Sequence, residues 1–351
     1  MAGGLMNVKG ITGTNQAGTR SEPKLKEVFD GDFLIGAAVN PLTIRAQEAL
    51  LVHHFNSITA ENEMKFERIH PAKDTYEFGA ADALVSFAGR HGMKVRGHTL
   101  VWHNQSTDWL FEDGSENLTD RGTLLSRLKS HIDTVVGRYK GAIYAWDVVN
   151  EAVSDEGEEL LRSSKWLDIA GPDFIAKAFE YAHEADPNAL LFYNDYNESH
   201  PHKRDKIYRL LKSLLDQGVP LHGVGLQAHW NLYDPQLDDI RTAIEKYASL
   251  GLELHLTELD MSVFRFEDRR SDLAEPTPEM AELQAQRYEA IFRLLKEYRD
   301  VIGSVTFWGA ADDYTWLDDF PVRGRKNWPF LFDASHRPKP AFYRVVEGAQ
   351  G

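Results

Sequence analysis

The feature that most constrains this chain is a regular alternation of short apolar segments with longer segments of helical periodicity. Eight apolar segments of strand character recur, beginning at Phe33, Asn56, Lys94, Ile143, Leu190, Gly223, Leu252 and Ser304. Between them lie stretches such as PDFIAKAFEYAHEADP and DKIYRLLKSLLDQG, in which apolar residues recur three and four positions apart. Glycine or proline lies near the ends of these stretches, as expected for helices. Eight alternating units predict an α/β fold, a (β/α)8 TIM barrel.

A doubly wound open sheet would show the same local alternation, so the ends of the strand segments become informative. Nearly every segment stops at a polar or aromatic cluster: Asn40, Glu61 with Asn62, His98 with Trp102 and His103, Asn150 with Glu151, Asn194, Gln227 with His229, Glu258 with Asp260, and Trp308. In a barrel the carboxyl ends of the strands meet at one mouth, whereas an open sheet would scatter them. The barrel is therefore favoured, with its site at that mouth.

Composition excludes several classes of partner and of site. The chain of 351 residues is 42% hydrophobic, which suits a substantial core, and its formal net charge of -15 disfavours nucleic-acid and anionic-membrane partners. Because cysteine is absent, the chain can form no disulfide, thiolate metal site or catalytic thiol. It also has no phosphate-binding glycine loop and no Gly-x-Ser-x-Gly elbow. The composition carries no signal of oligomeric state.

The first twenty residues, MAGGLMNVKGITGTNQAGTR, are polar and glycine-rich and lack the apolar core of a signal peptide. They also contain no 18-residue apolar span. We therefore expect residues 1–22 to form a flexible N-terminal extension and residues 23–351 to form a single catalytic domain. A cytoplasmic location is predicted.

Two acidic strand ends carry the chemistry predicted for the mouth. WDVVNE, at the end of the fourth segment, places Glu151 there, and LTELD, at the end of the seventh, places Glu258 across from it. A glycosidic bond needs such a pair, because one acid protonates the leaving oxygen while a second carboxylate attacks the anomeric carbon or positions a water. Structural carboxylates at a barrel rim are an alternative, as is a metal-dependent hydrolase built on His98, His103 and His229.

Seven motifs occur in a fixed order along nearly the whole chain. They are ENEMKFE at Glu61, VRGHTLVWHNQ at Val95, WDVVNEAV at Trp146, YNDYN at Tyr193, GLQAHW at Gly225, HLTELD at His255 and FWG at Phe307. In order and spacing, from about Phe29 to Phe342, they resemble the family-ten glycoside hydrolases, the endo-β-1,4-xylanases. Because a signal peptide, cysteine and an accessory binding module are not seen, the chain looks most like the intracellular branch of that family. The resemblance implies hydrolysis of internal β-1,4 bonds in xylan fragments and xylo-oligosaccharides, with no metal and no cofactor.

The resemblance also implies a retaining mechanism with a covalent glycosyl-enzyme intermediate. Glu151 would be the general acid/base and Glu258 the nucleophile, with their carboxyl groups about 5 to 5.5 Å apart. Their environments must move their pKa values in opposite directions. His229 would bridge Glu258 to Asp260 and keep the nucleophile ionised, while nearby negative charge would keep Glu151 protonated.

The same resemblance implies which residues bind the sugars. The hydroxyls before the scissile bond would be hydrogen-bonded by Glu61, Asn62 and Lys65. Asn150 would bond the sugar 2-hydroxyl, an interaction that strengthens in the transition state. His98 would contact the sugar at the cleavage point, with Asp147 paired behind it as a supporting residue.

Aromatic residues would form the walls of the cleft. Trp102, Trp308 and Trp316 would pack against sugar faces and restrict the space near C5, where xylose carries only hydrogen and glucose carries a hydroxymethyl group. Tyr196 would stack a sugar on the leaving side. The remaining polar candidates are Gln105, Gln227 and His103, the last as a supporting residue.

Two alternatives and one loop stay open at this point. A β-1,4-glucanase or mixed xyloside/glucoside hydrolase would need room around Trp316, and a non-catalytic carbohydrate-binding barrel would have no need of paired acids. The loop after the eighth segment carries Arg323, Arg325 and Lys326. A solvated basic patch is the default interpretation, and a contact with acidic glucuronosyl decorations is the alternative hypothesis.

Overall fold

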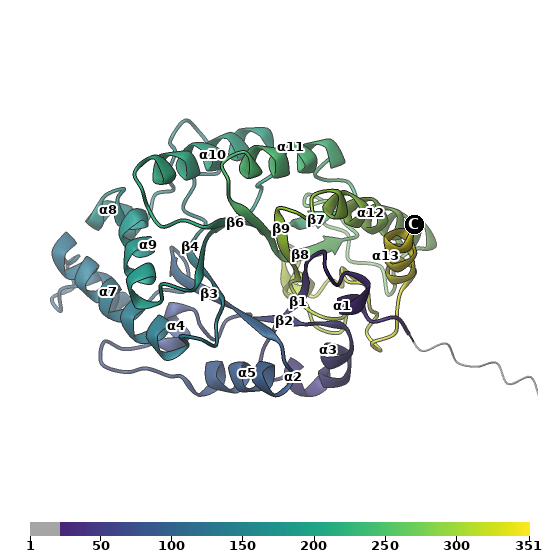
Figure 1. Ribbon diagram of the computed structural model, residues 1–351, viewed down its shortest axis with the longest axis horizontal. Helices are drawn as coiled ribbons and strands as arrows, with labels where there is room; N and C mark the ends of the chain where they lie inside the picture. Colours follow the sequence, from purple (N-terminus) through teal and green to yellow (C-terminus); the bar gives the residue numbers. More distant parts are fainter. Residues whose placement is uncertain (1–21) are drawn as a thin grey trace, which may run out of the picture.

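Eight parallel strands close into a barrel in the computed structural model, which describes residues 22–351 (Figure 1). They are β1 (Leu34–Val39), β2 (Ser57–Ala60), β3 (Lys94–Trp102), β4 (Ala145–Asn150), β5 (Leu190–Asp195), β6 (Gly223–Leu226), β8 (Glu253–Ser262) and β9 (Ile302–Phe307). Closure comes from the pairings of β6 with β8 and of β9 with β1. The predicted (β/α)8 barrel is confirmed, and the open sheet is excluded. The predicted extension over residues 1–22 lies, except for Glu22, outside the described residues, so this division of the chain stays a prediction.

Helices surround the barrel (Figure 1). The longer ones are α5 (Gly79–Arg90), α7 (Arg121–Arg138), α9 (Phe174–Ala185), α10 (Pro201–Asp216), α11 (Leu237–Ala248), α12 (Pro278–Glu297) and α13 (Pro340–Gln350). The shorter ones are α1 (Leu25–Val28), α2 (Thr43–Ala46), α3 (Glu48–His54), α4 (Phe66–Ile69), α6 (Asp108–Phe111), α8 (Lys165–Ala170) and the 3-10 turn η1 (Trp316–Asp319).

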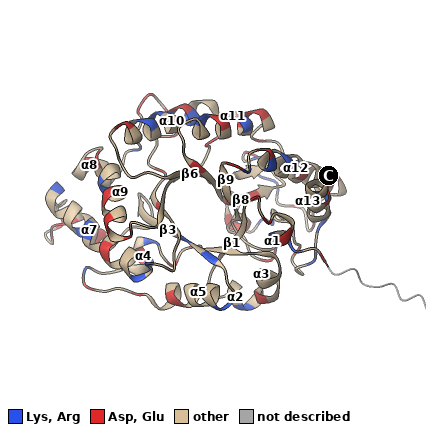
Figure 2. Ribbon diagram, in the orientation of Figure 1, with Lys and Arg blue, Asp and Glu red and all other residues tan. Residues whose placement is uncertain are grey.

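The helices are amphipathic, which explains how they cover the sheet. In α9, for example, Phe174, Ala178 and Ala182 are buried at a spacing of four residues, so that one stripe of the helix packs against the strands. Charged positions lie mostly on the helices and loops around the barrel (Figure 2). Within residues 22–351 no helix combines the length and apolar character needed to cross a membrane.

The sixth predicted strand segment is broken in two. β6 ends at Leu226, and β7 (His229–Asn231) begins after a residue in the left-handed region, Ala228, with φ of 61°. In the described part of the chain β7 pairs with β8 alone, and this register sets His229 opposite Asp260. The sequence pattern did not predict the break, which brings about the expected contact between His229 and Asp260 at the mouth.

A buried ion pair ties three strands together below the mouth. Arg96 on β3 is fully buried and donates from Nη1 and Nη2 to the two carboxylate oxygens of Asp147 on β4, at 3.1 and 2.9 Å. Its Nε donates to Nδ1 of His255 on β8 at 3.0 Å. Burial opposes ionisation of Asp147, but the charge of Arg96 and the hydrogen bond with His98 lower its pKa to about 2. Asp147 therefore stays ionised inside the barrel, with both partners in place.

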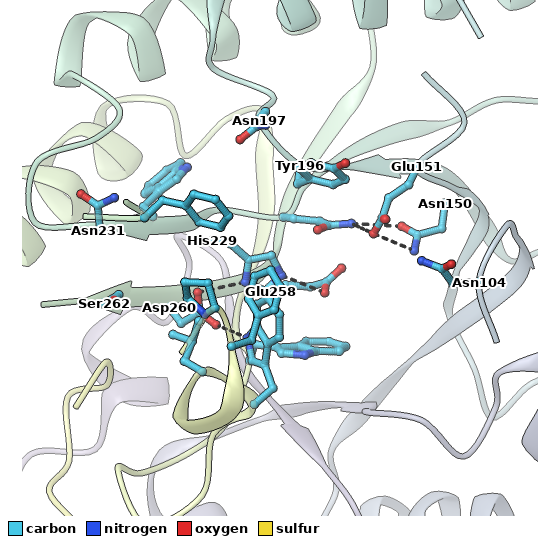
Figure 3. A pocket seen from close by; sticks show the side chains of 18 of the residues that line it. Asn104, Asn150, Glu151, Tyr196, Asn197, His229, Asn231, Glu258, Asp260 and Ser262 are labelled. Atoms are coloured by element: carbon cyan, nitrogen blue, oxygen red, sulfur yellow. Dashed lines mark hydrogen bonds and ion pairs between the residues drawn. The ribbon is translucent and has the colours of Figure 1, made fainter. Parts of the chain in front are cut away.

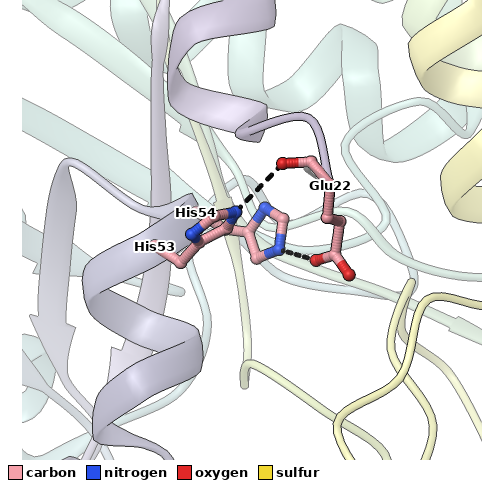
Figure 4. Close-up of side chains that lie close together, drawn as sticks. All are labelled: Glu22, His53 and His54. Atoms are coloured by element: carbon pink, nitrogen blue, oxygen red, sulfur yellow. Dashed lines mark hydrogen bonds and ion pairs between the residues drawn. The ribbon is translucent and has the colours of Figure 1, made fainter. Parts of the chain in front are cut away.

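Glu22, the first residue that the structure describes, is hydrogen-bonded to the end of α3 (Figure 4). Glu22, His53 and His54 bring three potential metal-ligand atoms within 4.8 Å of one another. However, Nδ1 of buried His54 accepts the backbone N–H of Leu25 at 3.3 Å, and burial lowers the pKa of this histidine to about 3. The neutral ring therefore carries its proton on Nε2 and donates it to Glu22 at 2.6 Å. Hydrogen bonds alone therefore explain why these side chains lie together, and they anchor the beginning of the described chain to α3.

We predict that Gly97→Ala destabilises the barrel by about 1–3 kcal/mol, because overpacking a filled core has this cost. Gly97 on β3 pairs with Trp146 on β4, and an added Cβ would overlap the fully buried indole ring. Gly89→Ala on α5 is the matched control, since nothing lies within 4 Å of its added Cβ and alanine favours a helix by roughly 1 kcal/mol. Urea unfolding of both variants measures the difference. Equal midpoints for Gly97→Ala and wild type would contradict the packing argument.

Candidate active site

A cleft of about 1080 Å³ opens at the carboxyl ends of the barrel strands (Figure 3). All but one of the predicted site residues line it: Glu61, Asn62, Lys65, His98, Trp102, His103, Gln105, Asn150, Glu151, Tyr196, Gln227, His229, Glu258, Asp260, Trp308 and Trp316. The exception is Asp147, which lies behind His98 at 2.8 Å from its Nδ1. Side chains from distant parts of the sequence therefore share one site.

Glu151 lies on a strained turn directly after β4. Its φ of 60° falls in the left-handed region, which few residues other than glycine adopt. The backbone N–H of Glu151 donates to the carbonyl of Asn194 at 2.9 Å, and the backbone carbonyl of Glu151 accepts from Nε of Arg162 at 2.9 Å. The hydroxyl of Tyr193 accepts the next two backbone N–H groups, at 3.0 and 3.1 Å. These contacts hold the turn that places the Glu151 carboxyl in the cleft.

The carboxyl group of Glu151 is almost surrounded by protein. It accepts hydrogen bonds from Nε1 of Trp102 at 3.1 Å and from Nε2 of Gln227 at 2.8 Å. Burial raises the pKa of Glu151, and the negative charges of Asp195 and Glu258 raise it further, while the two hydrogen bonds oppose the shift. The main cause of the shift is thus burial rather than the neighbouring negative charge named from the sequence.

Glu258, on β8, has the opposite electrostatic environment. Its Oε1 lies 3.1 Å from Nε2 of His229, and its Oε2 accepts from Nδ2 of Asn194 at 2.9 Å. Burial alone would raise the pKa of Glu258. The hydrogen bond from His229, the positive charges of His98 and His229, and the bond from Asn194 outweigh burial and lower the pKa below its ordinary value. Glu258 is therefore held ionised.

His229 is the central member of a chain of hydrogen bonds (Figure 3). Its Nδ1 lies 2.9 Å from Oδ1 of Asp260, and the other oxygen of Asp260 accepts from Nε1 of Trp316 at 2.8 Å. Burial disfavours a charged ring, but the carboxylates of Asp260 and Glu258 on its two sides raise the pKa of His229 well above its ordinary value. The imidazolium donates from both nitrogens, which gives the bridge predicted from the sequence.

Three amide side chains connect the two carboxyl groups. Nε2 of Gln227 donates to Glu151 at 2.8 Å and to Oδ1 of Asn150 at 3.1 Å. Nδ2 of Asn194 donates to the same Asn150 oxygen at 3.0 Å and to Glu258 at 2.9 Å. Nδ2 of Asn150 donates to Glu151 at 3.2 Å. This neutral bridge fixes both carboxyl groups and adds no charge that would bring their pKa values together.

A second polar network occupies the part of the cleft formed by the connection after β2. Nζ of Lys65 donates to Asn62 at 2.9 Å and to Gln105 at 3.3 Å. Glu61 accepts from Nδ2 of Asn62 at 3.0 Å and from the hydroxyl of Tyr314 at 3.1 Å. Burial raises the pKa of Glu61 and lowers that of Lys65, since it disfavours both charges. The network presents closely spaced donors and acceptors in fixed positions.

Specific contacts also fix the aromatic candidates. Trp308 meets the ring of His98 edge to face, with centroids 5.4 Å apart. The hydroxyl of Tyr196 accepts from Nη2 of Arg162 at 2.9 Å, and Nζ of Lys203 lies 4.1 Å from the ring centroid. The Tyr196 ring is therefore held at the cleft wall with one face covered by a cation.

Some residues of the site were not identified as such from the sequence. Asn194 had a usable signal, because it is one of the polar strand ends named above, and the structure pairs it in register with Asn150. Arg162 and Tyr314 had none, since they lie in connections whose path the periodicity does not determine. His103 was predicted as a supporting residue. Burial lowers its pKa to about 4, and its Nδ1 has no hydrogen-bond partner among residues 22–351.

Known proteins resemble this chain over nearly its full length. Residues 24–348 match the sequence profile of glycosyl hydrolase family 10. An endo-1,4-beta-xylanase of Geobacillus stearothermophilus is 64% identical over 327 residues, which cover 93% of this chain and 98% of that protein. The solved structure of xylanase XynB from Paenibacillus barcinonensis with a conduramine derivative superposes with a TM-score of 0.92 at 59% identity, covering 93% of this chain and 99% of that one.

A second solved structure, a variant in complex with xylotriose, superposes with a TM-score of 0.91 at 53% identity and covers 93% of this chain and 100% of that one. Agreement of this extent in sequence and in fold leaves no part of the described barrel outside the similarity. The chain therefore belongs to glycosyl hydrolase family 10.

Proposed function

We propose that this glycoside hydrolase is a retaining endo-1,4-β-xylanase that cleaves internal bonds of xylan fragments and xylo-oligosaccharides. The observation that carries the proposal is the pair Glu151 and Glu258, a half-buried and a buried side chain in one cleft whose carboxyl pKa values are shifted in opposite directions. The substrate class is supported by the similarity to a xylanase at 64% identity and to a solved structure that contains xylotriose.

In the first step a carboxylate oxygen of Glu258 attacks the anomeric carbon while the bond to the leaving oxygen breaks. Glu151 transfers its proton to that oxygen, and a covalent glycosyl-enzyme ester forms. The lowered pKa of Glu258 favours the ionised nucleophile, and the raised pKa of Glu151 favours the protonated acid. The free N–H of the Asn150 amide would hydrogen-bond the sugar 2-hydroxyl as charge develops on the ring.

In the second step a water molecule gives a proton to Glu151 and attacks the anomeric carbon, which releases Glu258. Formation of the ester removes the negative charge of Glu258, and that charge contributes to the raised pKa of Glu151. The pKa of Glu151 therefore falls once the intermediate has formed, and the residue changes from acid to base. Two inversions at the same carbon restore the original configuration.

The remaining residues of the cleft would select and hold the sugar chain. Glu61, Asn62 and Lys65 would offer donors and acceptors to sugar hydroxyls on the glycone side, and Tyr196 would offer a flat face to a leaving-side sugar. Trp316, held by Asp260, would fill the space near C5 that a hydroxymethyl group requires. We therefore expect the cleft to prefer a xylosyl unit to a glucosyl unit.

We predict that NMR of xylopentaose hydrolysis shows the β-anomer first. With an aryl β-xylobioside that has a good leaving group, Glu151→Ala in azide should give the β-xylobiosyl azide, because azide attacks the intermediate, while Glu258→Ala should give the α-xylobiosyl azide by direct attack. Glu151→Ala should slow hydrolysis of xylopentaose by about 100- to 10,000-fold. Glu158→Ala, which removes an exposed carboxylate from the same connection, is the control.

An initial α-anomer, or the reverse pairing of azide products with variants, would show that the two carboxylates have been misassigned. Faster hydrolysis of a cello-oligosaccharide than of the matching xylo-oligosaccharide would contradict the proposed substrate.

We predict that Gln227→Leu moves the basic limb of the pH profile of kcat/KM upward by roughly half to one unit, the equivalent of one lost hydrogen bond. Gln227 donates to the ionised form of Glu151, so that its loss raises the pKa of this acid further. The acidic limb, which follows Glu258, should stay in place because Gln227 makes no bond to that carboxylate. A downward move of the basic limb would refute the assignment of this limb to Glu151.

A further inference from the structure

One cation in the loop after β9 is buried, contrary to the default interpretation of that loop as a solvated basic patch. Arg325 is 3% exposed and lines the cleft, whereas Arg323 and Lys326 are exposed. Lys326 is also paired with Asp318 at 3.0 Å. Of the three cations noted in the sequence, Arg325 is therefore the one placed to meet a ligand in the cleft.

The guanidinium group of Arg325 is held in a fixed plane. Its Cζ lies 4.0 Å from the ring centroid of Phe264, which packs against its face. Its Nη1 donates to the backbone carbonyls of Asp268 and Arg270, at 2.5 and 3.1 Å. These contacts link the loop after β9 to the loop after β8, and they use only one of the three guanidinium nitrogens.

The other two nitrogens of Arg325 have no partner. Nε and Nη2 are buried and form no hydrogen bond within residues 22–351. The neighbouring carboxylate of Asp268 is instead paired with Arg270 at 3.2 Å. The N–H groups of Nε and Nη2 are parallel on one edge of the guanidinium plane, where they match the two oxygens of a carboxylate. Buried donors without an acceptor are costly, so this edge is suited to a ligand.

The surroundings of this edge favour an anionic sugar. Burial lowers the pKa of Arg325, and the charges of Arg269 and Arg270 lower it further, against the opposing charge of Asp268. An added anion would relieve this repulsion. Phe266 and Phe320, which are 56% and 44% exposed, also line the cleft with their ring centroids 6.0 Å apart, and exposed rings of this kind suit sugar faces.

We propose that Arg325 forms a carboxylate subsite that binds the uronosyl substituent of a decorated xylo-oligosaccharide through two parallel N–H···O bonds. This inference rests on the proposed function, because it takes the sugar backbone to lie in the cleft. The two nitrogens are covered in the free protein, so binding requires nearby chain to shift, and we take it to be residues 265–270, which bond Nη1 through the carbonyls of Asp268 and Arg270. Most side chains of this segment are exposed, and its movement therefore uncovers little apolar surface.

The test compares an oligosaccharide carrying one glucuronosyl group with the same compound after reduction of its carboxyl to an alcohol. Wild type should show a kcat/KM about tenfold higher for the acid form, the value of a charge-assisted bond. Arg325→Met should bring the ratio of the two kcat/KM values to about one. Arg325→Lys, which keeps the positive charge but lacks the two parallel N–H groups, should lower the ratio. The ratio is measured within one enzyme, so a partly unfolded variant does not distort it.

Arg323→Met is the matched control, because it removes an exposed cation from the same loop and should leave the ratio unchanged. A wild-type ratio of about one, or a ratio that survives in Arg325→Met, would overturn the carboxylate subsite. If plain xylo-oligosaccharides were not hydrolysed, the proposed function would fail instead. Calorimetric binding of the acid and reduced forms to Glu258→Ala, with and without Arg325→Met, would then still decide the role of Arg325.

Discussion

Two carboxyl groups that share one buried cleft repel each other when both are ionised, and the rest of the site is arranged around this constraint. Burial pushes both Glu151 and Glu258 toward the protonated form, so the protein must treat them differently if one is to act as an acid and the other as a nucleophile. It does so by the placement of positive charge. The imidazolium of His229 lies against Glu258, while Glu151 receives only neutral donors. This asymmetry, to which the charge of His98 also contributes, separates the two pKa values.

The cation in turn needs support, which the barrel supplies. Asp260 stabilises the imidazolium and is itself held by Trp316, so the orientation of the nucleophile depends on residues from β7, β8 and the loop after β9. Below this level, Arg96 and Asp147 form a buried pair in which each member neutralises the other. Such a pair specifies geometry more than it adds stability, because the cost of removing both charges from water offsets most of their attraction. It fixes His98 at the base of the cleft.

Residues at the rim of the cleft differ from those at its centre in how fully their hydrogen-bonding groups are satisfied. The central side chains satisfy one another, whereas Arg325 is packed on Phe264 and bonded to two carbonyls, yet keeps two donors without acceptors. Loops bear little of the barrel's packing, so they can carry such an unsatisfied group without loss of the fold. Residues at the centre would thus define the reaction, and residues on the connecting loops would define which substituted chains are accepted.

The sequence by itself determined the barrel, because eight alternations of strand and helix periodicity are local patterns. It also determined that Glu151, Glu258 and His229 lie at the mouth of the barrel, since motif positions can be read along the chain. Only the tertiary structure decided that Ala228 breaks a strand and that burial, more than charge, raises the pKa of Glu151. Likewise, only the folded chain buries Arg325 among exposed neighbours. Burial and hydrogen-bond partners are set by segments distant in sequence, and no local pattern encodes how those segments meet.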